Sequence, residues 1–336
     1  MEIHRRKKMK KILYALMAVV IIIFTAGCST KQESKDLKKV DFILDWTPNT
    51  NHTGIYVAKE KGYFKEAGID LEIKLPPEDS SSDLVINNKA PFTIYFQDSM
   101  ANKLSKGAGI TAVAAIVEHN TSGIISSKDK AITQPKDLEG KKYGTWNDPI
   151  ELAMIKNIME KQSADFSKLQ LVPNNDSNSI VSIENKAFDA AWIYYGWDGL
   201  MAKNMNIDTN FFYLKDFAKE LDYYSPIIIA NNEYLKNNKE EATKIIKAIK
   251  KGYIYAIDHP EEAAEILIKN APELQDKKDF VIESQKYLSK QYAKDKNKWG
   301  EIDPERWNNF YNWINENKIT KNPLEKNAGF SNDYLK

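Results

Sequence analysis

The sequence predicts an α/β protein with two lobes, and three observations support this class. From Val40 onward, short apolar segments typical of strands alternate with segments typical of helices, an order that favours a mostly parallel sheet. The same pattern starts again near Gly123, as a second unit of the same kind. From Glu233 onward the chain is almost wholly helical. Because a run of helices cannot build its own sheet, we expect this tail to pack on the first lobe.

The first lobe is expected to hold residues 39–122 and 225–336. Its clearest strand is the continuous apolar run at 110–117, which is typical of a strand buried on both faces. Glycines 62 and 68 are expected to close the first helix. The expected elements before the first crossing are strands at 40–44, 69–74, 92–96 and 110–117, and helices at 55–64, 80–88 and 98–105.

The second lobe is expected to hold residues 123–224. The chain then returns through an apolar strand to the first lobe, so we expect two crossings, near 121–124 and 222–226. Within the second lobe the expected elements are strands near 143 and at 169–172 and 189–193, with helices at 151–161 and 179–185. After the second lobe, a strand is expected at 224–230 and helices at 240–257, 260–269, 279–293 and 304–316.

The N-terminus has the features of a targeting segment. A basic stretch precedes an apolar run at 12–25, which is shorter than the roughly 20 residues that a spanning helix needs. Small residues and Cys28, the only cysteine, follow, and this order resembles a bacterial lipoprotein signal. We expect residues 1–27 to be a signal peptide, Cys28 to carry the lipid, palmitate included, and residues 28–38 to be a tether. An uncleaved anchor is the alternative. Both place the chain outside the cytoplasm, at a membrane surface.

Composition narrows the function classes. A single cysteine excludes an intrachain disulfide. Without residues 1–27 the chain has 42 Lys and Arg against 46 Asp and Glu, a net charge of −4. A mildly acidic chain without a long basic tract is a poor binder of nucleic acid. No HExxH, CxxC or EF-hand spacing occurs, so we expect no metal site.

Side chains capable of specific contacts are concentrated after the strands. Ligands of such sheets bind beyond the carboxyl ends of the strands, so these loops are expected to meet at a cleft between the lobes. None of the loops contains Lys or Arg. The five loops are 45–54, 95–99, 118–123, 145–151 and 194–199.

Four motifs resemble one family. They are LDWTPNTNHTGIYVAKEKGYFKEAGIDLEI from Leu44, EHNTSG from Glu118, AWIYYGWDG from Ala191 and KKGYIYAIDHPEEAAEIL from Lys250. Read in order, they resemble the pyrimidine-precursor-binding lipoproteins of thiamine-salvage ABC importers. The resemblance covers the chain from about Val40 to its end.

The resemblance implies both a fold and a function. The fold is the two-lobed periplasmic-binding-protein (type II) fold, with two parallel-type sheets flanked by helices and a cleft between the lobes. The function is capture of formylaminopyrimidine or hydroxymethylpyrimidine, without catalysis or cofactor, for a membrane permease and its ATPase. The binding protein is held on the extracytoplasmic face of the cell membrane.

The chemistry of a flat aminopyrimidine selects the candidate ligand-binding residues. Large rings stack on it, a carboxylate accepts from its amino group and protonated ring nitrogen, and amides or imidazoles bond its substituents. We expect Glu151 to hold the amino edge, with Glu118 or Asp198 as the alternatives. The candidates are Trp46, Asn49, His52, Tyr95, Gln97, Glu118, His119, Asn120, Trp146, Glu151, Tyr195, Trp197 and Asp198. Of the adjacent pair Tyr194 and Tyr195 we favour Tyr195, because only one can face the cleft if the strand continues.

Each candidate also has a structural interpretation. Trp46 could cover the end of the sheet, and Asn49 could cap the following helix. His119 could bond only the backbone near a crossing. Glu151 could be a first-turn acid that faces solvent.

Two other functions remain open. A related fungal and plant synthase of the thiamine pyrimidine shares the fold and holds pyridoxal phosphate on a lysine, but this chain has Tyr95 at the corresponding place. A sulfonate- or nitrate-binding protein is the second alternative. Such anions need Arg, Lys or helix N-termini, and the five loops contain neither Arg nor Lys.

Overall fold

The computed structural model describes residues 37–76, 81–174 and 178–336. The expected signal peptide, Cys28 and nearly all of the tether lie outside these residues. Lys38–Lys336 forms one compact unit. Within the described part of the chain, no helix is both long and apolar enough to cross a membrane.

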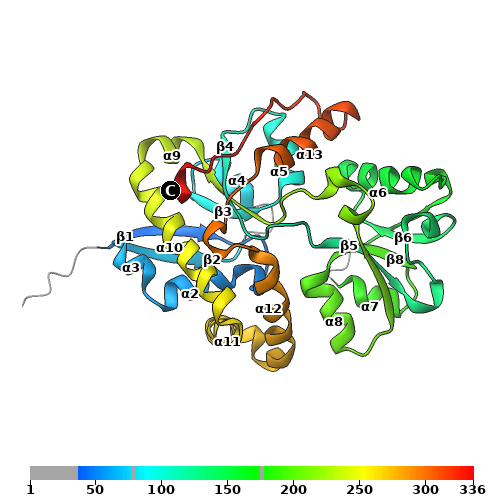
Figure 1. Ribbon diagram of the computed structural model, residues 1–336, viewed down its shortest axis with the longest axis horizontal. Coiled ribbons are helices and arrows are strands. Elements are labelled where there is room, and N and C mark those ends of the chain that lie inside the picture. The colour runs from blue at the N-terminus through cyan, green and yellow to red at the C-terminus, as the bar shows by residue number, and fades with distance from the viewer. Residues whose placement is uncertain (1–36, 77–80, 175–177) are drawn as a thin grey trace, which may run out of the picture. The chain divides into compact units, whose positions relative to one another are not determined.

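Two five-stranded sheets organise this unit (Figure 1). In the first sheet, the order is β2-β1-β3-β10-β4, and β10 runs antiparallel to both of its neighbours. Its strands are β1 Lys38–Ile43, β2 Ile69–Lys74, β3 Phe92–Tyr95, β4 Ile110–Ala115 and β10 Ile227–Asn231.

The second sheet has the order β7-β6-β8-β5-β9, and β5 runs antiparallel to β8 and β9. Its strands are β5 Ser122–Ser127, β6 Lys142–Thr145, β7 Gln170–Pro173, β8 Ala190–Tyr194 and β9 Thr209–Tyr213. The expected α/β fold with two lobes is confirmed, but both sheets are mixed rather than mostly parallel. The sequence did not predict β5 and β9 as strands.

The helices cover both sheets (Figure 1). The expected first helix is divided into α2 and α3, because Gly62 adopts a φ of 78° between them. The helices are α2 Thr53–Glu60, α3 Tyr63–Glu66, α4 Ser81–Ile86, α5 Gln97–Leu104, α6 Pro149–Lys161, α7 Ser179–Glu184, α8 Leu200–Asn204, α9 Asn232–Asn237, α10 Lys239–Asp258, α11 Pro260–Asn270, α12 Lys278–Tyr292 and α13 Pro304–Glu316.

The helical tail packs on the first sheet through close backbone contact. A Cβ placed on Gly252 of α10 would lie 1.9 Å from the carbonyl oxygen of Gly54 in α2. The next residue, Tyr253, donates its hydroxyl to the carbonyl of Asn51 and stacks on Trp299 at 4.2 Å between ring centroids. The tail therefore fixes α2 and the loop between β1 and α2.

The chain passes between the sheets twice, once from β4 to β5 and once from β9 to β10. Asn120 joins the two passages, because its amide donates to the carbonyl of Leu221 and accepts from the N–H of Ser122. Asp222 accepts from the N–H of Asn120 at 2.9 Å and pairs with His119 Nδ1 at 2.6 Å. These side chains hold the two passages together as a hinge.

Candidate functional site

A cavity of about 290 Å³ lies between the two sheets. Residues that follow β1, β3 and β8 line it together with Pro226, so both lobes contribute. This is the edge at which sheets of this kind bind ligands. The lining residues are Asp45, Trp46, Asn49, Asn51, Phe96, Tyr194, Trp197, Asp198 and Pro226.

The loop after β1 holds its carboxylate in a fixed orientation. The N–H of Asn49 donates to His52 Nδ1 at 3.2 Å, so this nitrogen must be an acceptor. The proton of the neutral ring therefore lies on Nε2, which contacts Asp45 Oδ1 at 2.7 Å. His52 is fully buried and does not line the cavity. It positions Asp45, and we had expected it to contact ligand.

Asn49 caps the helical turn that follows β1, and it also lines the cavity. Its side-chain oxygen accepts from the N–H of Asn51, and its amide nitrogen donates to the carbonyl of Thr47. The capping role expected from the sequence is present, and it leaves one face of this side chain at the cavity.

The turn after β8 supplies the opposite wall. Tyr194 is the last residue of the strand and lines the cavity, while its hydroxyl bonds Ser225 at 2.7 Å. Tyr195 begins the following turn and packs instead against Phe211, at 4.8 Å between ring centroids. Of the two tyrosines the structure places Tyr194 on the cavity, because β8 extends as far as Tyr194 and its alternation directs that residue inward.

Aromatic rings dominate the walls. The rings of Phe96 and Tyr194, one from each lobe, lie 6.3 Å apart between centroids with an interplanar angle of 22°. Trp197 meets Phe280 edge-on at 4.7 Å, and Trp46 is 41% exposed at the opening. Flat apolar ligands gain most from such surfaces.

The cavity is acidic. Asp45 and Asp198 line it, and its described lining includes no Lys or Arg. Burial raises the pKa of Asp198 to about 6. A ligand that offers N–H donors or a positive charge fits this field, and an anion does not.

Glu151, our first choice for the carboxylate, lies outside the cavity. It is 1% exposed, and its carboxylate accepts from the Tyr143 hydroxyl, the Thr145 hydroxyl and the Trp146 N–H. Burial raises its pKa, but three donors already occupy its oxygens. Of the three carboxylates expected to hold the amino edge of the ligand, only Asp198 lines the cavity.

Two amide candidates are also structural. Gln97 is fully buried, donates to the carbonyl of Trp307 and accepts from the N–H of Tyr224. Asn120 is fully buried at the hinge. Gln97 is engaged with backbone far away in the sequence, and Asn120 is engaged with Leu221 and with the nearby Ser122. Neither residue lines the cavity.

The remaining candidates do not line this cavity, and Glu118 lines a second one instead. Tyr95 contacts the ring of Phe96, and Trp146 is 50% exposed and contacts Trp192. His119 is held by Asp222. The backbone carbonyl of Glu118 accepts from Arg306, and its carboxylate accepts from the N–H of Lys294.

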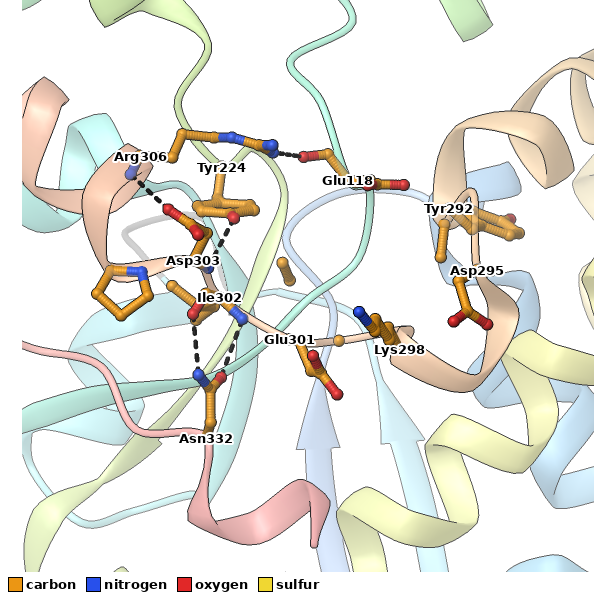
Figure 2. Close-up of a pocket in the computed structure, with 14 residues that line it drawn as sticks. Glu118, Tyr224, Tyr292, Asp295, Lys298, Glu301, Ile302, Asp303, Arg306 and Asn332 are labelled. Carbon is orange, nitrogen blue, oxygen red and sulfur yellow. Dashed lines mark hydrogen bonds between the residues drawn. The ribbon is translucent and has the colours of Figure 1, made fainter.

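A second cavity of about 380 Å³ lies beside the hinge, in the first lobe (Figure 2). Its polar groups bond one another: Asn332 both accepts from and donates to the backbone of Ile302, and the Tyr224 hydroxyl accepts from the N–H of Asp303. Arg306 extends across it toward Glu118 (Figure 2). We assign this cavity a supporting role, because all of its lining except Tyr224, at the return passage, belongs to the first lobe.

Helix α12 contacts the second lobe directly. Ser284 bonds the hydroxyl of Thr50 at 2.6 Å and donates to the carbonyl of Gly196. Farther along the helix, the hydroxyls of Tyr287 and Tyr213 lie 2.9 Å apart. We call these contacts of Ser284 and Tyr287 the interlobe latch.

The hinge carboxylate gives a prediction. Burial would raise the pKa of Asp222, but the hydrogen bond from His119, the Asn120 N–H and the nearby Arg306 hold it below its usual value. Such a group stabilises the fold above the ordinary carboxyl pKa of about 3.9, and this contribution is lost as pH falls through the lowered value. Asp222→Asn should lose about 1–2 kcal/mol of unfolding free energy at pH 7, measured by urea denaturation.

The loss should shrink toward zero in acid, where the parent carboxylate is itself protonated. The exposed Asp216→Asn is the control and should unfold as the parent does at every pH. A deficit for Asp222→Asn that is equal at pH 7 and in strong acid would contradict the electrostatic account.

Sequence reasoning missed five lining residues: Asp45, Asn51, Phe96, Tyr194 and Pro226. Four of them lie in the loops that the sequence analysis expects at the cleft. Their position after a strand was therefore the feature that could have identified them. Pro226 lies in the return passage, which carried no ligand signal. Among the described residues no group of His, Cys, Asp and Glu is arranged to hold a metal ion.

Comparison with known proteins places the chain in context. The family described as NMT1/THI5 like matches residues 49–263, more than half of the chain. A formylaminopyrimidine-binding protein of Halalkalibacterium halodurans is 26% identical over 330 residues, which are 96% of this chain and 98% of that protein. The 4-amino-5-hydroxymethyl-2-methylpyrimidine phosphate synthase THI5 of Saccharomyces cerevisiae is 25% identical over 250 residues, 70% of this chain and 72% of the synthase.

A solved structure shares the fold. The periplasmic aliphatic sulphonate binding protein SsuA of Escherichia coli superposes with a TM-score of 0.66 at 12% identity, covering 89% of this chain and 99% of that one. At this identity the likeness concerns the fold alone. The sequence match over residues 49–263 is the finding that assigns the family, and the chain belongs to the NMT1/THI5-like family.

Proposed function

We propose that this protein is the solute-binding component of an ABC importer and that its interlobe cavity binds a 4-aminopyrimidine precursor of thiamine. The observation that carries the proposal is a cavity walled by aromatic rings and lined by Asp45 and Asp198, with no described Lys or Arg on its lining. A flat, basic heterocycle matches both the rings and the charge. The similarity to a formylaminopyrimidine-binding protein over nearly the whole chain supports the same choice.

The protein itself carries out no chemistry in this proposal. Formylaminopyrimidine and hydroxymethylpyrimidine are the two ligands considered. The lobes close on the ligand, and the closed form delivers it to a membrane permease driven by an ATPase. A lipid on Cys28 would hold the protein at the extracytoplasmic face of the cell membrane.

The synthase alternative needs a lysine amine to bind pyridoxal phosphate covalently. The described residues that line the cavity supply none, and Tyr95 ends the third strand. The sulfonate or nitrate alternative needs a positive site, and the cavity carries two carboxylates instead. Both observations favour a binding protein for a basic solute.

The test is calorimetry with a matched pair of tryptophans. Trp46 and Trp146 are both largely exposed, but only Trp46 lines the cavity. Trp46→Ala should weaken binding of formylaminopyrimidine or hydroxymethylpyrimidine by about 1–3 kcal/mol, the usual range for loss of a ring that stacks on a base. Trp197→Ala should do the same.

Trp146→Ala is the control and should bind as the parent does. The proposal fails if the parent binds neither pyrimidine. The placement of the site fails if Trp146→Ala loses affinity while Trp46→Ala and Trp197→Ala keep it. Native mass spectrometry of protein purified without refolding would identify any retained ligand independently.

A further inference from the structure

Four buried polar atoms near the cavity, none of them on its described lining, make no hydrogen bond of ordinary geometry in the protein. They are Asp98 Oδ1, the hydroxyls of Ser122 and Tyr223, and the indole nitrogen of Trp192. Each side chain belongs to a residue that is at most 8% exposed. Buried polar groups are almost always paired, because a group that leaves water without a new partner loses its hydrogen bonds. We call these four groups the inner polar set.

Strand register brings the members of the second lobe together. Ser122 lies opposite Tyr194 in the β5–β8 pairing, and directly opposed residues share a face. Trp192 is two residues before Tyr194 in β8, so it shares this face as well, and its ring lies 6.1 Å from that of Tyr194. Tyr194 lines the cavity. Ser122 and Trp192 therefore flank a cavity wall.

The first lobe and the hinge complete the set. Asp98 lies in the first turn of α5, two residues after Phe96, which also lines the cavity. Its charge raises the pKa of Tyr194 and of Tyr223, after the larger effect of burial on each hydroxyl. Burial raises the pKa of Asp98 itself to about 6. The Tyr223 hydroxyl lies near enough to the Asp98 carboxyl to lower that pKa, and Ser122 lowers the pKa of Tyr223 in the same way, so these three groups are neighbours.

The set offers complementary chemistry. A carboxyl accepts, an indole N–H only donates, and hydroxyls do either. We infer that the inner polar set holds the polar substituent that projects from the ring of the ligand, with Asp98 accepting an N–H or O–H and Trp192 donating to an oxygen. This inference rests on the proposed function.

The inference also selects between the two proposed ligands. A formylamino substituent carries an N–H and a carbonyl oxygen on different atoms, so it can satisfy an acceptor and a donor at once. A hydroxymethyl substituent has a single oxygen for both roles. A site that is built to hydrogen-bond a substituent discriminates strongly against an analogue that lacks it, because its own groups then stay unpaired. Formylaminopyrimidine is the ligand that fits the set best.

The experiment measures discrimination rather than affinity alone. Calorimetry compares formylaminopyrimidine, hydroxymethylpyrimidine and 4-amino-2,5-dimethylpyrimidine, which has the ring but no polar substituent. The parent should bind formylaminopyrimidine at least tenfold more tightly than the dimethyl compound, with hydroxymethylpyrimidine between them. Tyr223→Phe and Asp98→Asn should each reduce this ratio at least threefold, and the affinity for the dimethyl compound should stay within twofold.

Tyr311→Phe is the matched control. Burial and the Asp98 charge also raise the pKa of Tyr311, but its hydroxyl already donates to the carbonyl of Gln97. Its removal should leave the ratio unchanged. Tyr223→Phe removes one oxygen from a buried ring, so it serves if Asp98→Asn does not fold.

Two outcomes separate the two proposals. A parent that binds all three pyrimidines equally would overturn the inference and leave the proposed function intact, with water satisfying the inner polar set. The inference would also be overturned, with the proposed function intact, if Tyr223→Phe kept the parent's ratio of affinities for formylaminopyrimidine and the dimethyl compound. A parent that binds none of the three would overturn both.

Discussion

Gly252→Ala should lose about 3 kcal/mol or more of unfolding free energy, or fail to fold. The added Cβ would lie 1.9 Å from the Gly54 carbonyl oxygen and 2.9 Å from the backbone nitrogen of Ala58. Both are backbone atoms of α2, so no flexible side chain can move aside, and α10 would have to separate from α2. Urea denaturation followed by circular dichroism would measure the loss.

Gly109→Ala is the control for this substitution. A Cβ at Gly109 would meet only the Cβ of Asn232, at an ordinary 3.9 Å, so the change should stay within about 1 kcal/mol of the parent. Equal stability of the two variants would show that α10 and α2 do not pack as closely as described.

Asp198→Asn should weaken binding of the proposed aminopyrimidine about one hundredfold, or about 2.7 kcal/mol. Removing one partner from a buried, hydrogen-bonded charge pair costs about 2–5 kcal/mol. Glu151→Gln is the control, because its carboxylate lies outside the cavity. That variant should lose stability and keep its affinity within twofold. Calorimetry that shows the reverse pattern would restore Glu151 as the ligand's partner.

The pH dependence follows from a raised pKa of about 6 for Asp198. The bound pair holds one proton between the carboxylate and the ring nitrogen. Below the pKa of both free groups each carries a proton, so binding must release one, and affinity should fall by up to tenfold per pH unit. Above both values binding must take up a proton, and affinity should fall again. In Asp198→Asn the affinity should no longer fall at alkaline pH, because an amide pairs with the neutral ring and needs no additional proton.

The strands and helices were largely predictable because their apolar residues follow local periods. The direction of the strands was not. β10 enters its sheet from the hinge rather than through a crossover helix, so nothing forces it parallel to its neighbours. β5 begins with Ser122 and Gly123 and contains two further serines, a composition that gave no strand signal.

Site residues were predictable where a loop follows a strand and also carries side chains suited to the ligand. Trp46, Asn49, Trp197 and Asp198 were expected, and the structure places all four on the cavity. Their binding of ligand stays a prediction.

Gln97 and His119 do not line the cavity, and the partners that hold them, Trp307 and Asp222, lie 210 and 103 residues away. Local sequence shows that a polar side chain is present but not whether distant backbone already occupies it.

The interlobe latch has a kinetic consequence. Ser284 joins the loop after β1 to the carbonyl of Gly196, next to a cavity residue, yet Ser284 does not line the cavity itself. In the proposed function, opening the lobes must break this contact before bound solute can leave. The residence time of the solute is therefore governed in part by a side chain that it never touches, and sequence changes along α12 can tune release without changing which molecule is recognised.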